Sequence, residues 1–178
     1  MTLRDIIAQA FGIVGLIIIV YSFQCKKNKN FFLMQGIGSS MFFVNFIIIG
    51  AFAGAFFNLS NLVRGLLFSK SDKKLWKLII TEILYTFCFV FSIFITRGDL
   101  FQIFLSALPY TALIVMSVYM WKGNPKHIRY SQVIYMSPAW IVHNIFNFSL
   151  GGIICESFNM VSSVIALIRY RKNNLETQ

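Results

Sequence analysis

The chain has 178 residues, of which 57% are hydrophobic, 17% aromatic and only 12% charged, and its formal net charge is +10. A soluble fold of this length could not cover so much apolar surface, so the composition excludes an ordinary soluble domain and predicts an all-α membrane protein embedded in a lipid bilayer. The basic residues fall in short clusters between apolar runs rather than on one amphipathic face, which argues against nucleic acid as a partner.

Apolar segments between the charged clusters are read as seven transmembrane helices, a number that rests on the charge pattern described below. In chain order, we expect them at residues 6–23, 31–49, 54–68, 75–96, 100–121, 130–148 and 152–170. At two of the junctions between predicted helices, the sequence stays apolar almost without a break. Residues 31–68 form one apolar run of 38 residues, roughly 57 Å as a straight helix against a hydrocarbon core of ~30 Å, so the chain must turn. We predict these turns at Gly50 to Gly54 and near Leu150-Gly151-Gly152, and the junction between helices four and five at Arg97 to Asp99.

Four basic clusters set the predicted topology, because Lys and Arg of short loops stay on the cytoplasmic side. The clusters are Lys26, Lys27 and Lys29; Lys70, Lys73, Lys74 and Lys77; Lys122, Lys126 and Arg129; and Arg169, Arg171 and Lys172. If all four face the cytoplasm, each intervening segment holds two helices, and one more helix precedes the first cluster. This count predicts seven spans, with the N-terminus outside and the C-terminus inside.

An internal repeat divides the seven helices into two like halves. An offset of 98 residues matches Phe42 with Trp140 and Asn45 with His143, and after the turn an offset of 101 matches the Phe-Asn steps at 57–58 and 158–159. We therefore predict a 3+1+3 arrangement of two parallel triple-helix units. The first unit is residues 1–70, the linker helix is 71–98, and the second unit with a short cytoplasmic tail is 99–178. Repeats of this kind commonly place a binding site at their interface near the midplane.

A family resemblance is carried by the second and third helices. The pattern begins with an aromatic residue that is followed three residues later by His or Asn. Two Gly-Ala steps, an Asn and a later Arg come next. In this chain the positions are Phe42, Asn45, Gly50-Ala51, Gly54-Ala55, Asn58 and Arg64. This layout resembles the YgjV-type bacterial inner-membrane proteins over nearly the whole chain, and it is distantly similar to the PQ-loop, SWEET and semiSWEET carriers. The resemblance implies location in the bacterial inner membrane. It also implies that Asn58, Asn159, Trp140 and its counterpart Phe42 face a central cavity.

Amides within hydrocarbon need partners, so the intramembrane asparagines are expected to face the bundle interior. For the matched pair Asn58 and Asn159 we favour binding of a small polar solute, since facing amides supply both donors and acceptors. Asn45 and His143 are further candidates for the same site. The alternative for any of these residues is an ordinary hydrogen bond between helices, and for Asn45 this alternative is the favoured one.

Intramembrane charge is costly, and each instance is a functional hypothesis. Arg64 and Glu82 lie at similar predicted depth and are expected to form an ion pair between helices three and four. The alternative is that Arg64 extends to the lipid headgroups. Glu156 and His143 are titratable groups within predicted spans and are candidates for proton coupling, with structural hydrogen bonding as the favoured alternative.

The sequence contains no metal-ligand spacing, phosphate loop or nucleophile set, so we expect neither an enzyme nor a cofactor or metal. The leading hypothesis is a carrier for a small, polar, sugar-like metabolite bound between the two repeats. The competing hypothesis is a non-transporting membrane protein that binds a lipid or a partner helix bundle. A central cavity open to one side favours the first, and a dry, packed seam favours the second. The sequence leaves a homo-oligomer open in either case.

Overall fold

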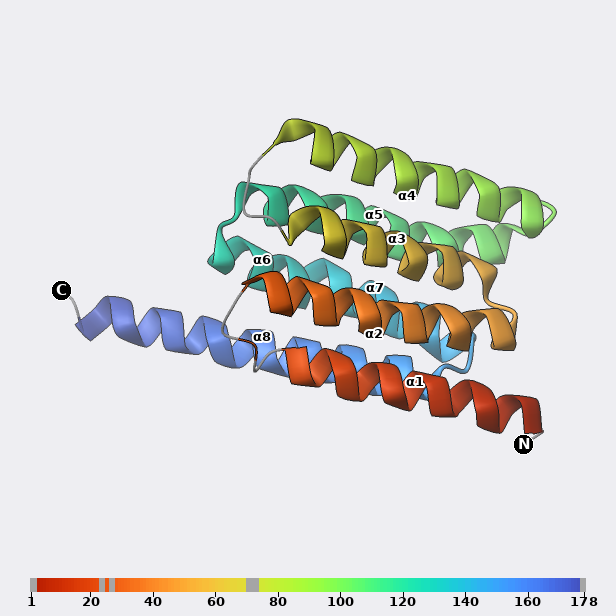
Figure 1. The fold of residues 1–178 in the computed structure, drawn as a ribbon, viewed down its shortest axis with the longest axis horizontal. Helices are drawn as coiled ribbons and strands as arrows, with labels where there is room; N and C mark the ends of the chain where they lie inside the picture. The colour runs from red at the N-terminus through yellow and green to blue at the C-terminus, as the bar shows by residue number, and fades with distance from the viewer. Residues whose placement is uncertain (1–2, 23–24, 26–27, 70–73, 177–178) are drawn as a thin grey trace.

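The computed structural model describes residues 3–22, 25, 28–69 and 74–176, and within these ranges it contains helices and no strand. The helices are α1 (Leu3–Ser22), α2 (Asn28–Ile49), α3 (Phe52–Phe68), α4 (Leu75–Ile95), α5 (Leu100–Lys122), α6 (Pro125–Ser131), the π-helical η1 (Gln132–Met136), α7 (Ser137–Phe146) and α8 (Leu150–Glu176). Because α6, η1 and α7 follow one another without a gap, the described residues form seven helical rods (Figure 1). The all-α prediction is confirmed.

Five helices are long and apolar enough to cross a membrane, namely α1, α2, α4, α5 and α8. The remaining two rods fall short for different reasons. α3 has 17 residues, which at ~1.5 Å per residue is about 25 Å against a ~30 Å hydrocarbon core. The rod α6–η1–α7 is interrupted by its π-helical turn, a wider turn that often marks a functional site. Its first turn, capped by the Asn124 side chain, begins earlier than predicted.

Two of the predicted turns are confirmed, and the third comes slightly earlier in the chain than predicted. The chain reverses at Gly50-Ala51, where Gly50 has φ +84°, and again at Arg97-Gly98 before Asp99 caps α5. The third reversal comes at residues 147–149, with Phe148 at φ +54°. Gly151 and Gly152 were predicted to make that turn, but both lie inside α8. Glycine is required at both positions because neighbouring residues approach them closely.

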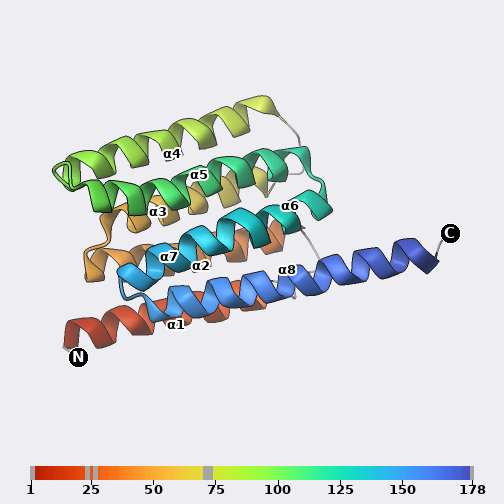
Figure 2. The same cartoon turned by 180° about the vertical axis from the view of Figure 1, so that it is seen from behind.

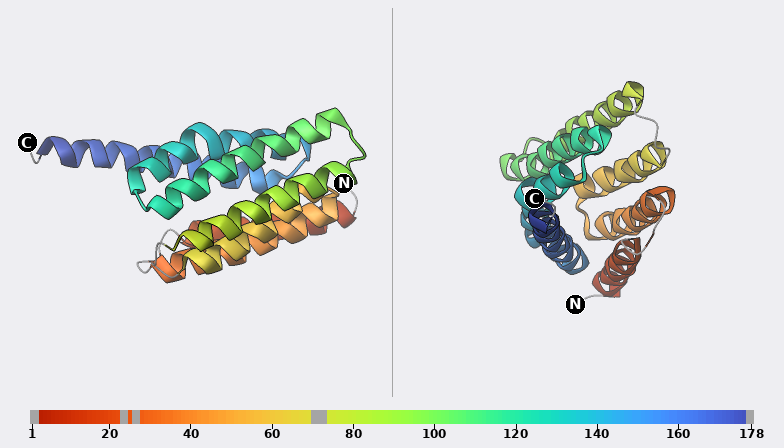
Figure 3. Two further views of the ribbon diagram at one scale, coloured as in Figure 1. Left: turned by 90° about the horizontal axis from the view of Figure 1, so that it is seen from above. Right: turned by 90° about the vertical axis from the view of Figure 1, so that its left-hand side faces the viewer.

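The helices form two layers (Figures 2 and 3). α1, α2, α3 and α4 make one layer, in which each helix packs on the next, and α5, the α6–η1–α7 rod and α8 make the other. α1 packs against α8 along one side, while α4 and α3 pack against α5 along the other. Phe46 and Phe57, two of the largest fully buried side chains, pack against Trp140 where the layers meet. The outer faces carry exposed apolar residues such as Ile83, Phe87 and Phe94 on α4, as expected for contact with lipid.

The N-terminus and the C-terminus lie at opposite ends of the bundle (Figure 1). We call the end where α5 finishes and α6 begins the basic end, and the opposite end the N-terminal end. The basic end carries Lys74, Lys122, Lys126, Arg129 and Arg169 among the described residues, and Arg4 and Arg97 lie at the N-terminal end. Lys26, Lys27, Lys70 and Lys73 of the predicted clusters lie outside the described residues. The side of the membrane that each end faces, the 3+1+3 grouping and the domain limits stay predictions.

Candidate solute-binding site

A cavity of about 600 Å³ lies between the two layers. Its lining residues come from both layers and run along the bundle axis. Phe46, Trp140 and Asn144 line it toward the N-terminal end, and Gly123, Arg129 and Tyr170 line it at the basic end. The cavity lining therefore runs from Asn144 and Gly152, near the start of α8, to the basic end.

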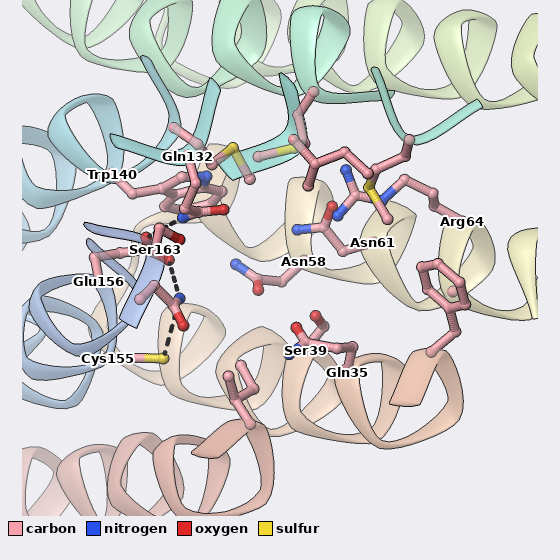
Figure 4. A pocket seen from close by; sticks show the side chains of 18 of the residues that line it. Gln35, Ser39, Asn58, Asn61, Arg64, Gln132, Trp140, Cys155, Glu156 and Ser163 are labelled. Atoms are coloured by element: carbon pink, nitrogen blue, oxygen red, sulfur yellow. Dashed lines mark hydrogen bonds between the residues drawn. The ribbon is translucent and has the colours of Figure 1, made fainter. Parts of the chain in front are cut away.

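One wall of the cavity is a polar stripe on α3. Asn58, Asn61 and Arg64 are spaced three residues apart, so they lie on one face of the helix. Asn58 is only 6% exposed, and its amide nitrogen donates to the carbonyl of Gly54 in the same helix at 2.9 Å. The Asn61 amide oxygen accepts a 2.6 Å hydrogen bond from the Tyr85 hydroxyl of α4. This bond fixes the amide so that its nitrogen turns toward the cavity (Figure 4).

The opposite wall is built around Glu156 of α8. Its Oε2 accepts hydrogen bonds from the Ser137 hydroxyl at 2.9 Å and from the Gln132 amide at 3.2 Å, and its Oε1 accepts from the Asn159 amide at 3.3 Å. The Gln132 amide also donates to the Ser137 hydroxyl at 2.9 Å. A partly buried carboxyl held by three donors is stabilised in a single orientation.

The π-helical turn explains how two donors reach Glu156 from the same rod. Gln132 is the first residue of the turn and Ser137 is the first residue after it. In a regular α-helix, residues five apart point in directions that differ by about 140°. The wider turn brings them closer to one face, since its repeat is about one residue longer. The irregular backbone thus positions Gln132 and Ser137 together over α8.

Aromatic rings line the cavity toward the N-terminal end. Phe42 and Trp140 are each 4% exposed, and Phe46 lies between them, with ring centroids 6.4 Å from Phe42 and 5.9 Å from Trp140. Phe57 packs edge-on against Trp140 at 6.5 Å. Phe42, Phe46 and Trp140 give a solute an apolar surface beside the two polar walls, and Phe57 supports Trp140 from behind.

Six residues singled out in the sequence line this cavity: Phe42, Asn58, Arg64, Trp140, Glu156 and Asn159. They come from α2, α3, α7 and α8, so the fold brings together residues that are far apart in the chain. The matched pairs Phe42 with Trp140 and Asn58 with Asn159 each have one member in either layer.

Asn45 was predicted as a candidate solute-binding residue, but its side chain is fully buried and does not line the cavity. Its nitrogen donates to the Ala8 carbonyl of α1 at 2.7 Å, and its oxygen accepts from the Ser149 hydroxyl at 2.9 Å. The amide therefore connects α1, α2 and the turn before α8. It is the interhelical bond that the sequence had favoured.

His143 is a second correction. The ring is 2% exposed, lies outside the cavity lining, and packs against Phe46 and Trp140 at centroid distances of 5.6 and 5.4 Å. Its Nδ1 has no hydrogen-bond partner among the described residues. A side chain at Gly54 would meet this ring at 2.7 Å, so the glycine makes room for it. His143 supports the aromatic end of the cavity from behind, which leaves Glu156 as the proton-coupling candidate within the site.

The predicted Arg64–Glu82 ion pair is not formed. Arg64 Nη1 and both carboxyl oxygens of Glu82 are buried without a hydrogen-bond partner among the described residues. The guanidinium carbon instead lies 5.9 Å from the centroid of the Tyr85 ring, and the side chain lines the cavity. Arg64 takes this direction because it continues the polar stripe of Asn58 and Asn61 on the inner face of α3.

Gln35, Ser39, Gln132 and Ser163 also line the cavity, although none of them was singled out as a site residue in the sequence. Each is a polar residue within a predicted span or at its edge. The argument applied to the asparagines would have found them, since glutamine and serine also need partners in hydrocarbon. The described residues contain no group of three His, Cys, Asp or Glu side chains that could hold a metal ion.

At the N-terminal end of the bundle, contacts join the two layers on the side of α1 and α8. Gln9 of α1 donates to the Phe148 carbonyl at 2.9 Å and accepts from the Leu150 amide at 3.1 Å. Next to it, a Cβ atom at Gly151 would lie 2.6 Å from the Gly12 carbonyl carbon, so the two backbones are in direct contact. Together with Asn45, these contacts join α1 to the start of α8.

Comparison with known proteins identifies a family to which the chain is similar. The model of the family Imp-YgjV, described as bacterial inner membrane protein, matches residues 6–174. No curated protein and no solved structure matches the chain. The YgjV-type resemblance predicted from the sequence is confirmed, while the more distant likeness to PQ-loop and SWEET carriers stays a prediction.

Proposed function

The chain belongs to the Imp-YgjV family of bacterial inner membrane proteins, and from this premise we propose that it is a carrier for a small polar metabolite. The observation that carries the proposal is the cavity of about 600 Å³ between the layers, lined by amides, hydroxyls and aromatic rings. This is the form of a small-molecule site, with apolar walls and a few convergent polar groups. The competing hypothesis of a non-transporting protein predicted a packed seam in the same place.

The order of the helices supports two like units around the site. α2 packs between α1 and α3, and the α6–η1–α7 rod packs between α5 and α8. α1 contacts α8 and α3 contacts α5, which is the exchange expected for two units related by a twofold axis. α4 packs at the edge, on α3 and α5, as a linker helix would.

Alternating access is the transport mechanism we propose, because the two ends of the bundle differ in this structure. The cavity reaches the basic end, which we assign to the cytoplasm from its lysines and arginines, and at the N-terminal end Gln9, Asn45 and the Gly12–Gly151 contact join the layers on the side of α1 and α8. Transport requires a second state in which these contacts separate and the basic end closes. Rocking of the two units about the central site is the motion that exchanges the two states.

Counterflow in proteoliposomes tests the proposal. The purified chain is reconstituted, the vesicles are loaded with pooled sugars, amino acids or organic acids, and uptake of labelled members of each pool is measured. We expect uptake of at least one pool, and a loss of about tenfold or more in Asn58→Ala/Asn159→Ala, since each amide contributes hydrogen bonds to the solute.

A matched control is Thr111→Ala/Ser157→Ala. Both hydroxyls are exposed and donate to carbonyls of their own helices, so transport should be unchanged. If no pool is taken up by the folded wild-type protein, or if the amide variant transports as well as the control, the carrier proposal is wrong and the lipid- or partner-binding alternative takes its place.

A further inference from the structure

We propose, as a refinement that rests on the proposed carrier function, that the cavity accepts an open-chain carboxylate whose far end carries hydrogen-bond donors. The reason is that the cavity is electrically polarised along its length. Arg64 of α3 lies at one side of it and Glu156 of α8 at the other (Figure 4).

The Arg64 end is suited to an anion. Nη1 of this guanidinium is buried and has no hydrogen-bond partner among the described residues, although the side chain lines the cavity. Leaving a buried charged donor unpaired is costly, so a ligand that pairs with it gains a large share of its affinity there. The Asn61 amide nitrogen faces the same region (Figure 4). The planar guanidinium of Arg64 beside the amide donor of Asn61 is better suited to binding a carboxylate than to binding a neutral hydroxyl.

The Glu156 end is suited to a donor. Oε2 already accepts from Ser137 and Gln132, which uses both of its lone pairs, whereas Oε1 accepts from Asn159 alone among the described residues. One accepting direction of Oε1 is therefore left for a ligand. An ammonium or hydroxyl group would use it and would avoid the repulsion that a second anion would meet there.

The separation of the two ends determines the length of the ligand. α3 and α8 both begin at the N-terminal end, and Arg64 lies twelve residues after the start of α3 while Glu156 lies six residues after the start of α8. Counted from the start of each helix, the two positions differ by six residues, which at ~1.5 Å per residue is roughly 9 Å of helix. The carboxyl and amino groups of an α-amino acid are too close together to reach both ends. A ligand that contacts both therefore carries its donor several bonds away from its carboxylate.

Ligand pairs that differ at the carboxylate provide the test. Binding to the purified full chain is measured by calorimetry for gluconate against glucitol, and for lysine against cadaverine. We expect the carboxylate member of at least one pair to bind, with its carboxylate-free partner weaker by about tenfold or more, the usual effect of a charge-assisted bond. The gluconate pair tests a hydroxyl as the distal donor, and the lysine pair tests an ammonium.

Variants then assign the two ends. Arg64→Gln and Arg64→Lys should both weaken binding of the carboxylate, the second less than the first because it keeps the charge and loses the fork. Glu156→Gln should weaken the lysine complex more than the gluconate complex. Arg97→Gln, an exposed arginine at the N-terminal end, is the matched control and should leave binding unchanged.

The failures of the two proposals are distinguishable. Equal binding within both ligand pairs, or wild-type affinity in Arg64→Gln, overturns the carboxylate assignment, and the wild-type comparison decides this even if that variant does not fold. Transport of a neutral sugar that depends on Asn58 and Asn159 would also overturn it and would keep the carrier. Tight binding of a carboxylate without counterflow would instead keep the assignment and overturn the carrier.

Discussion

The Ser137 hydroxyl lies 2.9 Å from Oε2 of Glu156 and donates a hydrogen bond to it. This bond joins the residue that follows the π-helical turn to the second turn of α8, and so connects two helices of the second layer. It also places the carboxyl of Glu156 at the wall of the cavity, where Gln132 and Asn159 complete its set of donors.

Ser137→Ala tests whether this bond holds the wall together. The substitution leaves the partly buried carboxyl of Glu156 with one donor fewer, and we expect a loss of about 0.5–2 kcal/mol of stability, seen as a lower melting temperature in detergent. Ser157→Ala is the control on α8, since that exposed hydroxyl donates only to the Ile153 carbonyl of its own helix among the bonds of the described residues. Equal melting temperatures for the two variants would contradict the role of Ser137.

Asn45 and Asn58 are predicted to respond in opposite ways to substitution by alanine. Asn45→Ala removes two bonds that connect separate segments, to Ala8 and from Ser149, and should cost about 1–3 kcal/mol of stability without changing the intrinsic affinity for a solute. Asn58→Ala removes a bond within α3 and should lower affinity with little effect on stability. Melting curves and binding isotherms measured on both variants check this. A lower affinity in a folded Asn45→Ala protein would return Asn45 to the binding site.

The sequence predicts those features of the fold that depend on local properties of the chain. Hydropathy and charge located the seven rods, because an apolar run and a basic loop are local properties of the chain. The turn before α8 was misplaced because glycine has two uses that a sequence does not separate. Gly50 provides a positive φ, whereas Gly151 provides a close contact between helices.

The site was predicted only in part for a similar reason. The repeat identified Asn58, Asn159, Phe42 and Trp140, all of which line the cavity. It also paired Asn45 with His143, which lie beyond the cavity, because a repeat gives equivalent positions without giving their depth. The π-helical turn that directs Gln132 toward Glu156 leaves no periodic pattern in the sequence, so Gln132 and Ser137 emerged as donors to Glu156 only from the structure.

Gly151→Ala is expected to disturb the N-terminal end of the bundle. A Cβ atom there would lie 2.6 Å from the carbonyl carbon of Gly12, a backbone atom that cannot move aside cheaply, so α1 and α8 must separate. We expect a loss of about 1–3 kcal/mol, the usual effect of overpacking, measured as a lower melting temperature.

The control lies on the other side of the same contact. A Cβ atom at Gly12 would lie 3.3 Å from the Asn45 side-chain nitrogen and 3.5 Å from Gly151, so Gly12→Ala should be tolerated much better. If both variants melt at the wild-type temperature, α1 and α8 are not in the close contact described here.

Glu82 gives the last prediction, because its two carboxyl oxygens are buried without a hydrogen-bond partner among the described residues. Replacing an unpaired buried carboxyl with a neutral amide relieves a desolvation cost, so Glu82→Gln should keep or raise the melting temperature, by up to about 1 kcal/mol in stability. Glu156→Gln, which exchanges a carboxyl held by three donors, should lower it. Thermal unfolding of both variants in the same detergent compares them directly. A marked fall in Glu82→Gln that disappears in an Arg64→Gln background would mean that these two residues pair in the membrane, as the sequence had predicted, because only a coupled pair gives such a non-additive result.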